Sequence, residues 1–344
     1  MNRLKTFIIA IVTIFLAAWL IPPVQSQEAS GPKAVMAYYE WSGSYAALAS
    51  NYSYINQLAT DTWGVNAHGV VTGQAPPEGL PFAKKKGMQT FATVSNFGKS
   101  DFSPHIAHAV ITNPSTKALT ISNLLNVVQT YGYSGVNIDF EAVPRKDRLA
   151  FSSFIHDVAQ KMRAAGYLTV VSAPAELEDN PSDSWTGAFD FKSIGADADI
   201  LQLMTYDENG PWGPPGPVAG LDWVEPCVQY AVSVMPSTKV SLGIPAYGYD
   251  WNLTRGTGVQ VKWKKIPALI SETGAVPQWD GTSSSPFFTY QTAGGSSHVV
   301  WYENATSIQL KSALVLSYNL TGVSAFALGF DDQSFWVAVH SPGF

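Results

Sequence analysis

Apolar and polar residues alternate along eight short segments of the chain, and this pattern is typical of β-strands. The clearest helical pattern spans residues 144–166, with apolar residues at helical spacing, Pro144 in its first turn and Gly166 as its stop. Other helical patterns separate several of the predicted strands. These strands are residues 34–41, 60–71, 89–98, 134–141, 168–175, 200–207, 239–251 and 322–332.

Strands that alternate with helices predict an α/β fold, and eight such strands predict a (β/α)8 TIM barrel, which typically needs about 250 residues. We expect the barrel to use residues 34–251 and 304–344. The segment between them, residues 252–303, has period-two alternation and turn residues instead of a barrel unit. We therefore expect a small α+β insertion between strands seven and eight.

Residues 1–26 are predicted to be an export signal. They combine a basic start with a short apolar run, and the expected cleavage follows Ser26. The run is short for a membrane span, although a retained anchor is the alternative. Residues 27–33 would be a linker. We therefore expect a bacterial protein that is secreted or associated with the cell wall, with no stable membrane insertion after cleavage.

Composition narrows the classes of function. Hydrophobic residues make up 46% of the chain, which is ample for a substantial core, and the net charge is -6. An acidic chain is not typical of a nucleic-acid binder, because polyanion binding needs clustered Lys and Arg. The single cysteine, Cys227, excludes an intramolecular disulfide, and we expect it to be a buried apolar residue. A neutral partner such as a sugar remains compatible with this composition.

The predicted strand at residues 134–141 carries two acids on one face. Asn137, Asp139 and Glu141 alternate with apolar residues, so in a barrel they would point toward the axis, with Glu141 nearest the active-site end. Carboxylates at this spacing are about 7 Å apart and raise each other's pKa. Capping of the next helix is the alternative, but it does not explain polar residues deeper in the strand. A Glu that is partly protonated near neutral pH suits a general acid for glycosidic cleavage.

Several motifs resemble the family 18 glycoside hydrolases, which are chitinase-like. SGVNIDFE (134–141) resembles that family's fourth-strand signature, and LMTYD (203–207), LGIPAYGYDW (242–251) and GVSAFALGFDD (322–332) resemble its later strands. The resemblance covers nearly all of the chain after the linker and is nearest to the bacterial spore-cortex and cell-wall N-acetylglucosaminidases. It implies a retaining hydrolase of β-1,4 linkages in N-acetylglucosamine-containing glycans, either peptidoglycan or chitin.

The resemblance also implies roles for individual residues. Glu141 would be the general acid and later the base, and Asp139 would orient the substrate's 2-acetamido group, whose carbonyl attacks the anomeric carbon. Tyr206 would donate a hydrogen bond to the same group. Aromatic side chains are the usual platforms for sugar rings. The expected substrate-binding residues are Asn137, Met204, Asp207, Tyr38, Trp212 and Phe326.

Two departures from the family pattern leave a non-catalytic chitin- or peptidoglycan-binding protein open. Phe326 stands where a Trp commonly forms the sugar platform, and Ser134 stands where an acid or amide is usual. A two-carboxylate glycosidase would need a second acid, for which Glu176 is the only tempting choice. We expect no cofactor and no metal, because His105 and His108 lack an acidic third ligand nearby. We expect a monomer.

Overall fold

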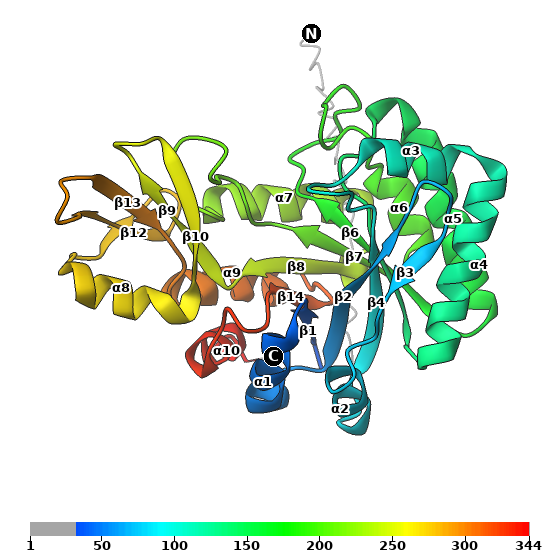
Figure 1. Cartoon of the computed structure of the whole chain (residues 1–344), viewed down its shortest axis with the longest axis horizontal. Helices are drawn as coiled ribbons and strands as arrows, with labels where there is room; N and C mark the ends of the chain where they lie inside the picture. Colours follow the sequence, from blue (N-terminus) through cyan, green and yellow to red (C-terminus); the bar gives the residue numbers. More distant parts are fainter. Residues whose placement is uncertain (1–31, 344) are drawn as a thin grey trace, which may run out of the picture. The chain divides into compact units, whose positions relative to one another are not determined.

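The computed structural model describes residues 32–343, and its centre is a closed barrel of parallel strands (Figure 1). The strand order is β1-β14-β8-β7-β6-β5-β4-β2, and pairing of β1 with β2 closes the ring. The predicted (β/α)8 barrel is therefore confirmed. The barrel strands are β1 (Ala34–Tyr39), β2 (Gln57–Val65), β4 (Gln89–Ser95), β5 (Gly135–Asp139), β6 (Leu168–Pro174), β7 (Ile200–Met204), β8 (Val240–Pro245) and β14 (Gly322–Phe326).

The second strand begins and ends earlier than residues 60–71, where alternation placed it. The chain turns after β2 and returns as the short antiparallel strand β3 (Val71–Gly73). The Asn66 side chain holds this turn by accepting hydrogen bonds from the backbone N–H groups of His68 and Val70. Both arms of the hairpin keep the strand pattern, so alternation alone does not locate the turn.

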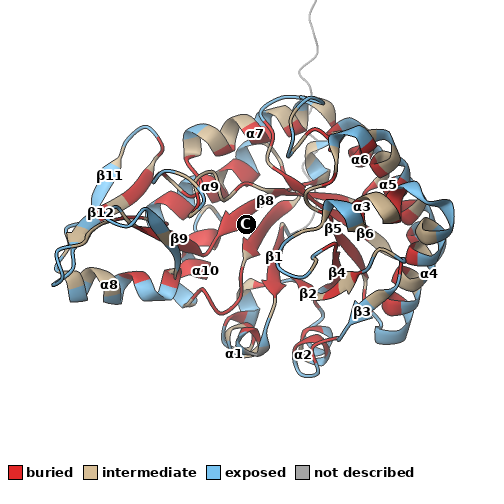
Figure 2. Ribbon diagram, turned by 45° about the horizontal axis from the view of Figure 1, so that its top comes forward, coloured by how far each residue is buried: buried red, intermediate tan, exposed pale blue. Residues whose placement is uncertain are grey.

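Helices cover the outside of the barrel, with their buried faces toward the strands (Figure 2). The helix predicted at residues 144–166 begins later, at Arg148, because Pro144 has an extended backbone and a short 3-10 turn follows it. The helices around the barrel are α1 (Ser42–Asn51), α2 (Gly79–Lys85), α3 (Pro104–Thr112), α4 (Pro114–Tyr131), α5 (Arg148–Ala164), α6 (Phe191–Asp197), α7 (Leu221–Val234), α9 (Ala305–Ser317) and α10 (Gln333–His340).

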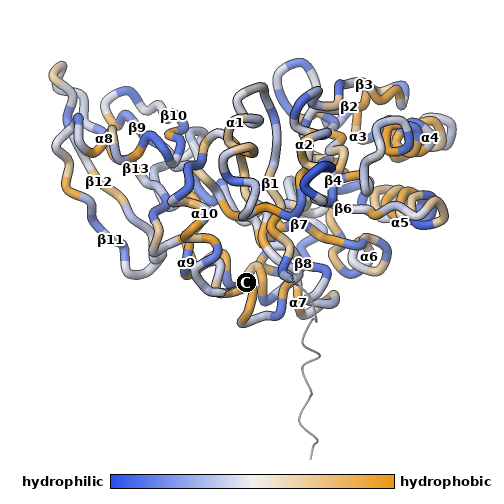
Figure 3. Tube along the Cα trace, turned by 90° about the horizontal axis from the view of Figure 1, so that it is seen from below, coloured by the Kyte–Doolittle hydropathy of each residue, from blue (hydrophilic) through white to orange (hydrophobic). Residues whose placement is uncertain are grey.

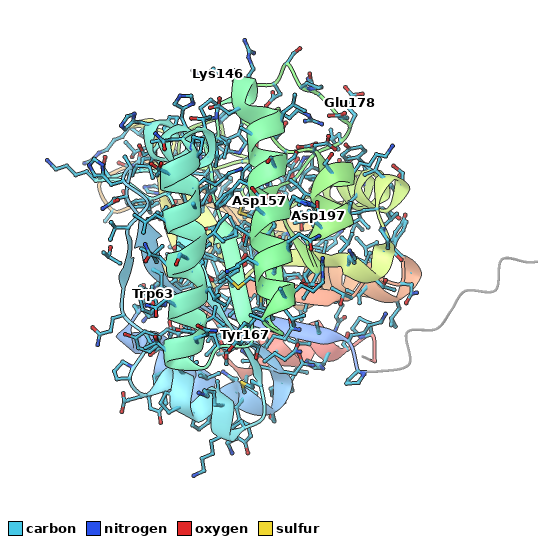
Figure 4. All side chains as sticks on the ribbon, turned by 90° about the vertical axis from the view of Figure 1, so that its right-hand side faces the viewer. Trp63, Lys146, Asp157, Tyr167, Glu178 and Asp197 are labelled. Carbon is cyan, nitrogen blue, oxygen red and sulfur yellow. The ribbon has the colours of Figure 1, made fainter. Side chains whose placement is uncertain are left out.

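Packing between β5 and α5 fixes which face of β5 points inward. Phe140, which follows the strand, stacks on Phe154 with ring centroids 5.5 Å apart and also on Phe151. On its outer side α5 lies beside α4, where Asp157 forms an ion pair with Lys117 at 2.7 Å (Figure 4). Because the apolar face of β5 is used against α5, its polar face must point into the barrel.

The expected α+β insertion is confirmed between β8 and β14, and Figure 3 shows it as a lobe beside the barrel. Its antiparallel sheet has the order β10-β9-β13-β12-β11, and one apolar layer packs against helix α8 (Ile266–Thr273). The sheet begins before residue 252, because the segment expected to be strand seven divides at Ala246. Its strands are β9 (Tyr247–Asn252), β10 (Thr257–Lys262), β11 (Gln278–Asp280), β12 (Ser285–Gln291) and β13 (Ser297–Trp301).

The proposed export signal at residues 1–26 and most of the linker lie outside the described residues. Within residues 32–343, no helix is long and apolar enough to span a membrane. Cys227 lies fully buried in α7, as expected for a small apolar residue, and burial raises the pKa of its thiol to about 12.

Closure of the barrel predicts a strong effect of Gly322→Ala. Gly322 pairs with Ala34 where β14 meets β1, and an added Cβ would overlap the Ala34 carbonyl. We expect the free energy of unfolding to fall by about 1–3 kcal/mol, as in other overpacked cores, measured by denaturant titration. Gly281→Ala is the matched control, because a Cβ there meets no atom within 4 Å. Equal stability of the two variants would contradict this account of closure.

Candidate active site

A cavity of about 1040 Å³ opens at the carboxyl ends of the barrel strands. Its lining includes the last residues of several strands, among them Ser95 of β4, Asp139 of β5 and Met204 of β7. This is the end at which TIM-barrel enzymes place their active sites. Of the residues singled out from the sequence, the cavity is lined by Glu141, Asp139, Tyr206, Met204, Asp207, Tyr38, Trp212 and Phe326.

Asn137 lies beneath the cavity and organises a buried network. Its Nδ2 donates to the Tyr38 hydroxyl at 2.8 Å, and its Oδ1 accepts from Ser172 Oγ at 3.1 Å. Ser172 also neighbours the Asp139 carboxyl, so its one hydroxyl proton is shared between the Asn137 amide oxygen and that carboxyl. The Tyr38 hydroxyl in turn donates a hydrogen bond to Gln202 Oε1 at 3.2 Å. Asn137 therefore supports Asp139 through Ser172 and does not itself line the cavity, although its sequence position led us to expect it among the substrate-binding residues.

The Glu141 side chain is poised to hold a proton. Burial, followed by the nearby Asp207 and Asp61 carboxylates, raises its pKa to about 8. Its backbone is fixed by Asn96, whose Oδ1 accepts from the Glu141 N–H at 2.9 Å and whose Nδ2 donates to the Glu141 carbonyl at 2.8 Å. Within the described residues, the Glu141 carboxyl itself has no hydrogen-bond partner. Burial and the neighbouring carboxylates thus favour its protonated form at neutral pH, and the carboxyl is open to a ligand.

Asp139 and Tyr206 are shifted in the same direction. Burial, and then the neighbouring Glu141 carboxylate, raise the pKa of Asp139 well above its usual value, while the Ser172 hydrogen bond counteracts them. Burial also raises the pKa of Tyr206, so its hydroxyl remains a donor at all working pH values. Asp139 and Glu141 are neighbouring carboxyl groups that resist double ionisation, so one can stay charged while the other holds a proton, and Tyr206 adds a hydroxyl donor.

Asp207 joins the barrel to the inserted lobe. Its carboxylate accepts from the Tyr247 hydroxyl at 2.7 Å and from the Tyr249 hydroxyl at 2.8 Å, and both tyrosines belong to β9. Burial raises the pKa of Asp207, and these two hydrogen bonds oppose the shift. Neither tyrosine was expected in the site from the sequence, although both lie in the motif LGIPAYGYDW. Their alternate spacing, which places them on one face, was the available indication.

Aromatic side chains form the walls and floor of the cavity. Phe326 lies on the floor, with ring centroids 5.9 Å from both Tyr38 and Tyr206. Trp212 projects from its loop with 73% of its surface exposed. Flat apolar walls of this kind suit the C–H faces of sugar rings. The lining aromatic residues that were not assigned to the site from the sequence are Trp63, Phe97, Phe102, Trp185, Trp223 and Tyr247.

Comparison with known proteins agrees with this geometry. The profile described as "Glycosyl hydrolases family 18" matches residues 36–331. The chain belongs to this family. The resemblance drawn from its motifs is therefore confirmed, and the chain is a family 18 glycosyl hydrolase.

Two relatives and one solved structure place the chain within family 18. The "Uncharacterized glycosylase YvbX" of Bacillus subtilis (strain 168) is 39% identical over 300 residues, which cover 86% of this chain and 87% of the relative. The "Cortical fragment-lytic enzyme" of the same organism is 28% identical, over 71% of this chain and 58% of that protein. The crystal structure of a chitinase from Chromobacterium violaceum ATCC 12472 has 40% identity and a TM-score of 0.87, over 90% of this chain and 99% of that one.

The histidines and the second acid weighed from the sequence lie elsewhere. His108 Nδ1 pairs with Asp147 Oδ2 at 2.7 Å, outside the cavity. Within residues 32–343, no cluster of three or more His, Cys, Asp or Glu side chains could hold a metal ion. Glu176 is 4% exposed and does not line the cavity, and neither of its carboxyl oxygens has a hydrogen-bond partner in the part of the chain that the structure describes. It offers no second carboxylate to a substrate in this family 18 cavity.

The buried Glu176 carboxyl should make the difference in stability between the wild type and Glu176→Gln depend on pH. Burial raises its pKa from 4.5 to about 9, so the folded chain holds this proton more tightly than the unfolded chain does. Stability is therefore lost as the pH rises from about 4.5 toward 9, and Glu176→Gln removes that loss. We expect the variant to be more stable than the wild type by about 1–3 kcal/mol at pH 8 and no more stable at pH 4.

Denaturant unfolding at several pH values measures this difference. Glu178→Gln is the matched control, because Glu178 lies exposed on the same loop (Figure 4), and we expect it to follow the wild type throughout. Parallel pH profiles for the wild type and Glu176→Gln would show that Glu176 is not protonated in the folded chain.

Proposed function

We propose that this family 18 enzyme is a retaining hydrolase of β-1,4 linkages in N-acetylglucosamine-containing glycans, either peptidoglycan or chitin, acting by substrate-assisted catalysis. The observation that carries the proposal is the state of Glu141. Its carboxyl faces the cavity without a hydrogen-bond partner among the described residues, and its pKa of about 8 keeps a proton available at neutral pH. A general acid needs that combination of access and protonation.

The first step breaks the glycosidic bond. Glu141 donates its proton to the leaving glycosidic oxygen while the carbonyl oxygen of the substrate's 2-acetamido group bonds to the anomeric carbon. Asp139 accepts a hydrogen bond from the acetamido N–H, and the Tyr206 hydroxyl donates to the same group. The positive charge that develops on the cyclised acetamido group is balanced by nearby carboxylates, Asp139 first among them.

The second step restores the enzyme. The Glu141 carboxylate left by the first step takes a proton from a water molecule, whose oxygen attacks the anomeric carbon from the face that the leaving group vacated. The bond to the acetamido oxygen breaks, and the product keeps the original configuration because two inversions have occurred. Asp207 and Met204 contact the sugar at the cleavage point in this arrangement, and Phe326 supports its ring.

The substrate proposal draws on chemistry and on relatives. Chitin and peptidoglycan strands both carry the acetamido group that the mechanism requires. The relatives include a chitinase and a cortical fragment-lytic enzyme by name, so both glycans remain within the proposal. Either polymer lies outside the cytoplasm, which fits the proposed export signal at residues 1–26 and a secreted or wall-associated monomer.

A non-catalytic glycan-binding protein is the rival proposal, and Phe326 is the observation that favours it. A Phe offers less stacking area than the Trp common at this position. It nevertheless closes the floor, packed between Tyr38, Tyr206 and Tyr247. Asp139, Glu141 and Tyr206 are all present in one cavity, which favours the enzyme.

Glu141→Gln tests the assignment of the general acid. Glutamine keeps the shape of the side chain but has no acidic proton, so we expect kcat/KM for a fluorogenic N-acetylglucosamine oligomer to fall by about 10²–10⁴. Oligomer binding, measured by calorimetry, should persist. Glu176→Gln is the matched control, because this Glu lies outside the cavity and its loss should leave kcat/KM within about twofold. Full activity of Glu141→Gln would refute the assignment.

A thiazoline analogue of the cyclised acetamido group tests substrate assistance. It mimics the proposed intermediate, so we expect competitive inhibition with an inhibition constant at least 10²-fold below KM, as for other mimics of high-energy states. N-acetylglucosamine itself, which lacks the fused ring, is the control ligand and should inhibit weakly. Equal inhibition by the two compounds would favour a two-carboxylate mechanism.

A further inference from the structure

Glu40 and Asp61 lie side by side at the mouth of the barrel. Tyr39 pairs with Thr60 in the β1–β2 ladder, so the next residue on each strand, Glu40 or Asp61, is adjacent to the other. Both residues line the cavity that contains Asp139 and Glu141. The proposed mechanism gives neither of them a contact with the substrate, although Asp61 helps to raise the pKa of Glu141.

Neither carboxyl group has a directly bonded partner within residues 32–343. Among the described residues, neither side chain makes a hydrogen bond or an ion pair. Lys262 acts on Glu40 only at a distance, because its Nζ lies over the Trp41 ring, 3.6 Å from the centroid. The residues that line the cavity include seven carboxylates and no Lys, Arg or His. The carboxylates are Glu40, Asp61, Asp101, Asp139, Glu141, Asp207 and Glu208.

Unpartnered carboxylates in a shielded cavity favour a cationic ligand. Burial raises the pKa of Asp61 to about 6 and that of Glu40 to about 7, so both are partly or mainly ionised at neutral pH. Such anions are costly without a partner. A sugar hydroxyl can donate to these carboxylates, but it leaves their negative charge uncompensated, whereas an ammonium group supplies both the hydrogen bonds and the opposite charge.

The pair belongs to a cavity built for more than one sugar unit. The volume of about 1040 Å³ is at the upper end of the range for small-molecule pockets. Aromatic walls extend from the floor at Phe326 to the rim at Trp185 and Trp212. A glycan whose cleaved unit is held at Asp139 and Glu141 therefore has a neighbouring unit within the same acidic lining.

We infer that Glu40 and Asp61 form a subsite for the protonated amino group of a glucosamine unit, so that the enzyme prefers partly N-deacetylated glycans to fully acetylated ones. The inference rests on the proposed function, because the cleaved unit must keep its acetamido group while a neighbouring unit carries the free amine. The substrate class is therefore a mixed oligomer of N-acetylglucosamine and glucosamine.

The test compares two oligomers of equal length, one fully acetylated and one with a single glucosamine unit beside the cleaved linkage. The readout is the ratio of their kcat/KM values, in which a general loss of activity cancels. We expect the wild type to favour the amino oligomer about tenfold at low salt, and the Glu40→Gln/Asp61→Asn double variant to reduce the ratio to about one. Added salt should also lower the wild-type ratio, although burial limits the effect.

Asp101→Asn is the matched control. Asp101 also lines the cavity, but it is exposed, so solvent screens its charge and we expect the ratio to stay near the wild-type value. A wild-type ratio near one, or a ratio that the double variant leaves unchanged, would overturn the inference while hydrolysis of the acetylated oligomer still supports the proposed function.

If neither oligomer is hydrolysed, a binding measurement still tests the amino-group subsite separately from the proposed hydrolase function. That result would contradict the proposed function alone. Calorimetry on the Glu141→Gln variant then compares the two dissociation constants directly. Tighter binding of the amino oligomer that disappears on adding Glu40→Gln and Asp61→Asn supports the subsite. Equal binding, or binding of neither oligomer, overturns it.

Discussion

The two-residue period of β5 is the constraint on which the site depends. Its apolar side chains, continued by Phe140, pack against α5, and this contact leaves Asn137, Asp139 and Glu141 no direction but inward. A shift of one residue in the strand register would exchange the two faces, burying the acids against a helix and turning the aromatic ring into the barrel. The packing of β5 against α5 therefore both stabilises this side of the barrel and directs the acidic side chains into the cavity.

Several ionisable groups are held away from water, and each costs stability. Asp139, Glu141, Asp61 and Asp207 all have raised pKa values, with burial as the largest cause. The barrel offsets this cost through an extensive apolar layer between strands and helices. Groups whose burial costs stability are gathered around one cavity, which is the arrangement expected of a functional site.

Much of the fold could be predicted from the sequence, because strands and helices leave local periodic patterns. The eight barrel strands, the insertion and the acids of β5 were all visible in this way. The hairpin after β2 and the division at Ala246 were not, because alternation continues through both. Other site residues come together only when the strands assemble into the barrel. Asn96, which hydrogen-bonds the Glu141 backbone, and Asp61, which acts on the Glu141 carboxyl, are examples. No local sequence pattern relates either residue to β5.

The link between Asp207 and the two tyrosines of β9 has a consequence for engineering. The lobe begins immediately after β8, and its first strand already supplies both hydrogen bonds that hold a carboxylate of the cavity. The lobe is thus not a detachable module, although its sheet and helix pack around a separate apolar layer. A chimera that exchanged this lobe for another would have to keep Tyr247 and Tyr249, so the usable crossover point lies beyond them, within β9.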